Sequence, residues 1–127
     1  MDMEKASRIL SDITVFGKYA RHIDHLDRRE TWDEICDRYE RMMVKRFPDL
    51  TQNITEAVTF VRQKKILPSM RMLQFAGAAI EKNESRGYNC AYCPVDHPDT
   101  FSEVMFLLLG GTGVGYSVQK HHVDKLP

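Results

Sequence analysis

The chain has 127 residues, of which 43% are hydrophobic, and its 18 basic and 18 acidic residues leave no net charge. This composition is typical of one soluble globular domain, or a piece of a larger one, and excludes a long disordered chain. The balanced charge lacks the basic excess that binds nucleic acid or an acidic membrane surface. No apolar run approaches the ~18 residues that span a bilayer. We therefore expect neither nucleic acid nor a membrane as a partner.

The first predicted helix of the chain begins at residues 31–34, where Thr31 and Glu34 form a capping box. Apolar residues at helical spacing follow as far as Phe47, and Pro48 ends the helix. A second capping box at residues 53–56 predicts another helix, with Lys64 and Lys65 in its last turn. The first thirty residues carry only short apolar clusters, and residues 70–79 are ambiguous.

The C-terminal half has a different character. Residues 88–95 predict a short strand that ends near Pro94, and residues 100–103 form a third capping box. The helix that follows is the most apolar of the chain, so we expect residues 104–109 to be buried. Gly110 and Gly111 end it, and residues 115–118 predict a strand. The composition changes near residue 66, so the fold class is α+β, with a helical region at 1–65 and a second region at 66–127.

Three cysteines, an odd number, fit a reducing compartment better than a secreted disulfide framework. The first four residues also lack the cationic start and apolar run of a signal peptide, so we expect a cytoplasmic location.

Cys36 lies on an apolar helix face, where a packing role is expected. Cys90 and Cys93 have the spacing of half a zinc site or of a redox pair. On a strand, however, residues three apart point to opposite faces, which favours a more distant partner for Cys90.

Glycines crowd residues 110–115, with only Thr112 and Val114 between them. The cluster is neither a P-loop nor a dinucleotide fingerprint, because no Gly-Lys-Ser/Thr closes it and the helix precedes the glycines. Two interpretations stay open. The glycines form a helix C-cap followed by a tight turn, or they let the backbone approach a bound nucleotide closely.

Four segments in the same order resemble the N-terminal region of adenosylcobalamin-dependent (class II) ribonucleotide reductases, including phage-encoded ones. They are Tyr19-Ala20-Arg21 with residues 29–34, residues 67–71 with Ala76-Gly77, Gly87-Tyr88-Asn89-Cys90, and residues 101–103 with 111–118. Each segment alone is weak, whereas their joint order and spacing are specific. The resemblance implies an N-terminal helical region that leads into the first strands of a ten-stranded α/β barrel.

The resemblance also implies a chemistry and a set of site residues. This family reduces the 2′-hydroxyl of ribonucleotides with a thiyl radical, and in class II adenosylcobalamin generates that radical. The cysteine of the Asn-Cys motif, here Cys90, is one of two that supply electrons and form a disulfide. A thioredoxin-like dithiol then reduces this disulfide. The residues that match positions lining the nucleotide pocket are Ser69, Asn89, Gly111, Gly113 and Gly115.

The radical cysteine and the second redox cysteine of the family belong to later barrel strands, and the matching motifs are absent here. We therefore expect the chain to bind no adenosylcobalamin by itself and to be inactive alone, requiring a C-terminal reductase fragment or subunit. Two alternatives remain open: a truncated, non-catalytic remnant, and a small Cys/Gly nucleotide- or metal-binding module. A partial barrel also exposes strand edges, so the isolated chain is expected to associate with itself.

Overall fold

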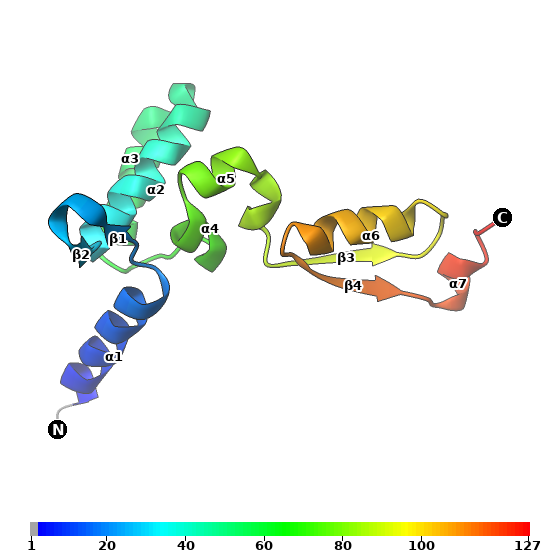
Figure 1. Cartoon of the computed structure of the whole chain (residues 1–127), viewed down its shortest axis with the longest axis horizontal. Coiled ribbons are helices and arrows are strands. Elements are labelled where there is room, and N and C mark those ends of the chain that lie inside the picture. The colour runs from blue at the N-terminus through cyan, green and yellow to red at the C-terminus, as the bar shows by residue number, and fades with distance from the viewer. Residues whose placement is uncertain (1–2) are drawn as a thin grey trace. The chain divides into compact units, whose positions relative to one another are not determined.

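The computed structural model describes residues 3–127 and divides the chain into two compact units, unit 1 (Met1–Glu81) and unit 2 (Lys82–Pro127) (Figure 1). The composition change near residue 66 therefore precedes the structural boundary. Residues 66–81 belong to unit 1 because Leu73, Ala76 and Ile80 are buried against its other residues. The predicted α+β class is confirmed, since both helices and paired strands are present.

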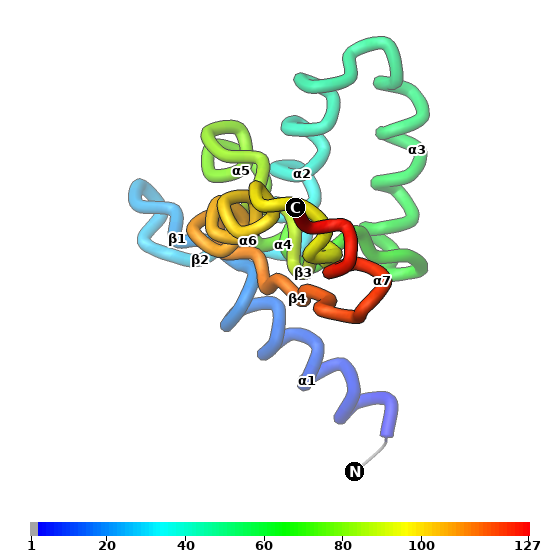
Figure 2. Tube along the Cα trace, turned by 90° about the vertical axis from the view of Figure 1, so that its right-hand side faces the viewer, coloured from blue at the N-terminus to red at the C-terminus, as the bar shows by residue number. Residues whose placement is uncertain are grey.

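Unit 1 is mainly helical. Its elements, in chain order, are α1 (Met3–Lys18), β1 (His22–Ile23), the 3₁₀ turn η1 (Asp24–Leu26), β2 (Arg28–Arg29), α2 (Trp32–Arg46), the 3₁₀ turn η2 (Pro48–Leu50), α3 (Thr51–Arg62), α4 (Met70–Phe75) and α5 (Ala78–Lys82), which ends at the boundary. β1 and β2 form a two-stranded antiparallel hairpin. Helices α2 and α3 lie side by side in both views (Figures 1 and 2).

Helix α2 carries the core of unit 1 because its apolar residues reach three groups of neighbours. Ile35 packs with Ala20 and Leu73, and Cys36 packs with Val58 and Val61 of α3. Met42 packs in a third cluster, with two residues of the α4–α5 region. Burial of this apolar surface is the main stabilising contribution to unit 1. The predicted packing role of Cys36 is confirmed, since its side chain is fully buried.

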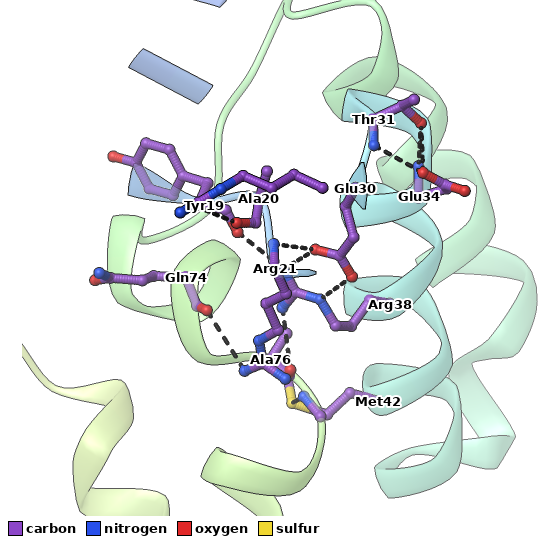
Figure 3. Close-up of polar contacts among 12 residues, drawn as sticks. Tyr19, Ala20, Arg21, Glu30, Thr31, Glu34, Arg38, Met42, Gln74 and Ala76 are labelled. Carbon is purple, nitrogen blue, oxygen red and sulfur yellow. Dashed lines mark hydrogen bonds and ion pairs between the residues drawn. The ribbon is translucent and has the colours of Figure 1, made fainter. Parts of the chain in front are cut away.

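An ion pair inside unit 1 joins segments that are distant in sequence (Figure 3). The Arg38 guanidinium donates two hydrogen bonds of 2.9 Å to the Glu30 carboxylate, and both side chains are about nine-tenths buried. Arg38 also donates to the carbonyl oxygens of Ala76 (3.0 Å) and Tyr19 (3.3 Å). The backbone N–H of Arg21 donates to Glu30 at 3.0 Å. This cluster fixes the chain before α2 and the chain after α4 to the same helix.

The Thr31 capping box is confirmed, because the Thr31 hydroxyl accepts from the Glu34 N–H while the Glu34 carboxylate accepts from the Thr31 N–H. The predicted box at residues 53–56 is wrong: α3 begins earlier, at Thr51, directly after η2. Asn53 is therefore already helical and cannot act as the N-cap. Helix α3 also ends at Arg62, before Lys64, whose φ of 56° is left-handed.

Helix α1 is a further difference from the sequence interpretation, which predicted no element over the first thirty residues. It runs for 16 residues from Met3, yet none of its side chains is buried. Its apolar and polar residues lie on separate faces, so the period was present in the sequence. Among residues 3–127 the structure has no helix that is long and apolar enough to cross a membrane.

Unit 2 is built on a strand–helix–strand arrangement. The 3₁₀ turn η3 (Glu84–Gly87) leads into β3 (Cys90–Pro94), followed by α6 (Thr100–Leu109), β4 (Gly113–Ser117) and α7 (Lys120–Val123). Strands β3 and β4 pair in parallel, as a helical crossover between them allows. The predicted strand ending near Pro94 and the predicted helix ending at Gly110 and Gly111 are both confirmed.

Two details of α6 correct the sequence interpretation. Its N-cap is Asp99 rather than Thr100, and no side chain caps the helix; the Thr100 hydroxyl instead donates to the carbonyl oxygen of Pro94. The expectation that residues 104–109 are buried is wrong, because Phe106 is 66% exposed and Leu109 is 81% exposed. Only one face of α6 packs on the two strands of unit 2, so its other apolar face meets solvent.

Candidate active site

The parallel pairing of β3 with β4 places the predicted redox cysteine beside a predicted glycine. Cys90 pairs with Gly113, and two residues further along each strand Tyr92 pairs with Gly115. The N–H of Gly113 also donates to the carbonyl oxygen of Asn89 at 3.0 Å. The motif around Cys90 and the glycine-rich segment, more than twenty residues apart in sequence, are therefore adjacent in space.

Side-chain alternation gives this small sheet one open face. Cys90 and Tyr92 are exposed, whereas Ala91 and Cys93, which point to the other face, are partly buried. Paired residues of adjacent strands point to the same side, so the neighbours of Cys90 and Tyr92 on that face are glycines. No side chain of β4 stands beside the Cys90 thiol, and a ligand can approach it over the glycine backbone.

The fold itself explains why two residues of the cluster, Gly110 and Gly111, are glycines. Gly111 follows α6 with a φ of 89°, the left-handed conformation that glycine adopts most easily at the end of a helix. A Cβ at Gly110 would lie 2.2 Å from the Ser85 Oγ and 3.0 Å from the Ser85 Cβ, so any side chain there would force Ser85 to move. Helix termination and close packing are thus sufficient to explain these two glycines.

Gly113 and Gly115 have no such reason. Neither has a left-handed φ, and the nearest atom to a Cβ would lie at 3.5 Å for Gly113 and 4.0 Å for Gly115, both ordinary contacts. Glycine in the interior of a strand costs conformational entropy and marks sites of close approach by a ligand or another backbone. The end of the helix therefore accounts for Gly110 and Gly111, and for Gly113 and Gly115 close approach of a ligand stays a prediction.

The remaining predicted pocket residues lie in different places. Asn89 is exposed immediately before Cys90, on the same stretch of chain. Ser69 belongs to unit 1, at the N-cap position of α4, where its side chain makes no capping hydrogen bond. The structure brings together Asn89, Cys90 and Gly113, with Gly115 further along the same strand and Gly111 just before it. It does not relate Ser69 to them.

All three cysteines are free thiols in the structure. Burial raises the pKa of the Cys36 thiol, and Arg62 opposes this shift only in part. Cys90 and Cys93 both lie on β3, three residues apart, which agrees with the expectation that they face opposite sides. Within residues 3–127 no group of three or more His, Cys, Asp or Glu side chains gathers as a metal site would require.

Tyr92 is a candidate residue that the sequence analysis did not single out. It lies two positions after Cys90, is 66% exposed on the same face, and pairs with Gly115. The period of two along a strand was the signal that pointed to it. An exposed aromatic ring beside a thiol and a glycine backbone offers a flat apolar surface next to any group that reaches Cys90.

The fold is similar to a solved structure described as a B12-dependent (class II) ribonucleotide reductase. The two superpose with a TM-score of 0.74 at 20% sequence identity, over 100% of this chain and 24% of that chain. The chain thus spans about a quarter of the length of the reductase that it matches. A scan against protein-family models finds no match, and a search of the curated proteins finds none either. The likeness at this identity establishes a shared fold.

Proposed function

We propose that this chain is part of an adenosylcobalamin-dependent ribonucleotide reductase, to which it contributes one redox-active cysteine and part of the nucleotide pocket. The observation that carries the proposal is the placement of Cys90, exposed on β3 directly beside Gly113, in a fold shared with a class II reductase. The open face of β3 and β4 offers a thiol, an aromatic ring and bare backbone to one ligand.

The chemistry assigned to Cys90 is the supply of reducing electrons. Cys90 and a second cysteine, outside this chain, each lose one electron and one proton, and their sulfurs join in a disulfide. The ribonucleotide loses its 2′-oxygen as water and gains a hydrogen at C2′, so atoms and electrons balance. Thiol–disulfide exchange with a thioredoxin-like dithiol then returns both thiols. Cys90 suits this role because its thiol is exposed and strand-mounted, whereas Cys36 is buried.

The pocket role is assigned to backbone rather than to charged side chains. The N–H of Gly113 is already used in its hydrogen bond to Asn89, so Gly113 contributes shape and access. Gly115 extends the same bare surface beside Tyr92, and a sugar or base can lie over it. Gly111 also belongs to the proposed pocket through the family resemblance, whereas the same role for Ser69, in unit 1, stays a prediction. Which phosphate form of the ribonucleotide is reduced is set outside these residues.

The apolar pocket of unit 1 is too small for adenosylcobalamin. Unit 1 has an apolar cavity of about 360 Å³, lined by residues such as Tyr39, Ile54 and Leu67. That volume suits a small drug-sized ligand, and a corrin ring with its adenosyl and nucleotide substituents is far larger. The cofactor would be held by the remaining part of the barrel, which we propose is supplied by a C-terminal reductase fragment or subunit. The ten-stranded barrel itself belongs to that assembled enzyme.

Mixing experiments test the proposal. The purified chain is combined with a polypeptide that carries the remaining three-quarters of a class II reductase, and deoxyribonucleotide formation is measured with adenosylcobalamin and a dithiol. We expect turnover from the mixture and none from either polypeptide alone. Cys90→Ser should abolish turnover, while Cys93→Ser, on the other face of the same strand, should retain most of it.

The same assay examines the pocket and has clear contrary outcomes. The fold accommodates Gly115→Ala. This variant should raise KM for the ribonucleotide while leaving the urea midpoint of the chain nearly unchanged. Full activity of Cys90→Ser with the dithiol would show that the assigned cysteine is wrong. A native mixture that forms a complex without turnover would instead favour the non-catalytic remnant. Stoichiometric zinc in the purified chain would favour the metal-binding module.

A further inference from the structure

Helix α1 presents its apolar face to solvent. Met3, Ile9, Leu10, Ile13 and Phe16 recur at spacings that place them on one side of the helix, and their exposed fractions range from 46% to 87%. An amphipathic helix normally turns this side toward a protein core, because water disfavours contiguous apolar surface. The apolar face of α1 therefore requires a partner outside unit 1.

The opposite, polar face of α1 contacts the rest of unit 1, and this leaves the apolar face turned toward solvent. The Lys64 Nζ donates to the Ser11 Oγ at 3.0 Å and lies 3.7 Å from an Asp12 oxygen. Val15 packs against the buried cluster around Ala20. These contacts hold the polar side and the last turn of α1 to unit 1. Figure 2 shows the rest of the helix running away from α2 and α3.

The order of the apolar residues is symmetric about the centre of the helix. Met3 and Phe16 are equally far from the midpoint between residues 9 and 10, as are Ala6 and Ile13. Ile9 and Leu10 flank the midpoint itself. A helix with this symmetry is complementary to an antiparallel copy of itself, in which each residue of a pair lies at the same level along the contact as the other member on the second chain. Such a two-fold contact is the commonest form of association between identical chains.

Charges at the border of the apolar face select the same arrangement. Lys5 and Asp12 are seven residues apart, or two helical turns, and therefore lie on the same side of α1. In an antiparallel pair Lys5 of each copy lies near Asp12 of the other, within ~3 Å along the axis at a rise of 1.5 Å per residue. In a parallel pair the two copies of this border would lie on opposite sides of the contact, so Lys5 and Asp12 of the two chains would not meet. Asp12 is 77% exposed, so its contact with Lys64 leaves it accessible.

We propose that α1 is a self-association surface through which two copies of this chain pair in antiparallel orientation. Antiparallel pairing also places the two Lys18 ends, after which each chain continues, at opposite ends of the helix pair. A 16-residue helix is ~24 Å long, so the contact lies at the small end of protein interfaces. The dimer is accordingly reversible, with a dissociation constant on the order of micromolar. The inference does not depend on the reductase proposal.

Sedimentation equilibrium of the full chain across the micromolar range tests the inference. The native chain should behave as a concentration-dependent dimer. Leu10→Asp, at the centre of the apolar face, should weaken dimerisation at least tenfold. The matched control is Ser7→Asp, which places the same charge on the polar face of the same helix and should leave the dimer intact. Circular dichroism of both variants shows whether α1 remains helical.

Charge exchange tests the orientation. Lys5→Glu should weaken the dimer by placing two acidic residues together, and the double variant Lys5→Glu with Asp12→Lys should restore it. In a parallel pair the single variant would change little, because the two copies of residue 5 would lie on opposite sides of the contact.

Other outcomes would overturn the inference. A chain that is monomeric throughout the concentration range excludes it. A dimer that survives Leu10→Asp but is lost in Leu109→Asp would locate association on α6, where strand and helix surfaces of unit 2 are exposed. A monomeric chain whose complex with the remaining reductase polypeptide is lost in Leu10→Asp would assign the face to that polypeptide instead.

Discussion

The two units of the chain stabilise themselves in different ways. Unit 1 buries residues such as Ile35, Cys36 and Val58 around α2 and adds an enclosed ion pair. Unit 2 has a two-stranded sheet and one apolar helix, of which Phe106 and Leu109 are largely exposed. A two-stranded parallel sheet with a single covering helix buries little apolar surface. The proposed reactive thiol therefore lies in the unit that most requires further chain to complete it.

Thiol labelling gives the largest contrast between the units. Cys36 is fully buried and its pKa is raised by burial, whereas Cys90 is exposed. We expect iodoacetamide to modify Cys90 faster than Cys36 by on the order of 100-fold or more, because Cys36 reacts only when unit 1 opens. Peptide mass spectrometry of partially labelled chain measures both rates. Equal rates in native buffer would show that unit 1 is not a stable core.

The buried ion pair gives the largest expected change in free energy. Arg38→Met leaves the Glu30 carboxylate without its partner in a nearly enclosed site, which should destabilise unit 1 by about 3–5 kcal/mol. Urea unfolding followed by the fluorescence of Trp32, the single tryptophan, reports on this unit. The matched control is Arg28→Met. It removes an equally bidentate but solvent-exposed pair with Glu34 and should shift the midpoint much less.

Apolar truncation compares the two units directly. Ile35→Ala removes a fully buried side chain from unit 1 and should cost about 2–5 kcal/mol. Leu109→Ala, in the exposed face of α6, should change stability by less than about 0.5 kcal/mol in the isolated chain. A large loss from Leu109→Ala would mean that this face is already covered, for example by association between chains.

Glycine substitutions test whether the two ends of the glycine cluster differ. Gly111→Ala forces a side chain into a left-handed backbone and should destabilise unit 2 by about 1–2 kcal/mol. Gly113→Ala, with ordinary contacts and no left-handed φ, should be close to neutral. Hydrogen exchange of the β3 and β4 amides reports on this unit. If Gly113→Ala destabilised unit 2 as much as Gly111→Ala, the fold itself would explain Gly113 and a bound ligand would not be needed to explain it.

Acid titration should reveal a smaller effect at the start of α2. Hydrogen bonds from the Arg28 side chain and from the Thr31 N–H lower the pKa of the Glu34 carboxyl to about 2. Because this value is below that of the unfolded chain, ionised Glu34 stabilises the fold above the ordinary pKa of 4.5, and the contribution fades as the pH falls toward 2. The difference in urea midpoint between the native chain and Glu34→Gln should accordingly become smaller as the pH falls. A constant difference would contradict the assignment.

The sequence alone correctly predicted those helix and strand ends that depend on only a few neighbouring residues. The Thr31–Glu34 box, the end of α2 before Pro48, the strand before Pro94 and the end of α6 at its glycines all follow from capping, proline and glycine chemistry. The other two predicted capping boxes do not form because a preceding turn starts the helix at an earlier residue, as η2 does for α3. Residues that can cap a helix do so only where the chain enters the helix at that position.

The tertiary structure decided which residues meet and which are covered. Sequence predicted Cys90 and the glycines separately, and the parallel register of β3 and β4 placed Cys90 beside Gly113. Hydrophobicity predicted burial of α6, yet burial needs a second surface, and unit 2 supplies one for only one face of the helix. The same holds for α1, which is amphipathic but is held to unit 1 by Lys64 on its polar side. Propensity and periodicity are local properties, whereas register and coverage depend on where distant segments pack.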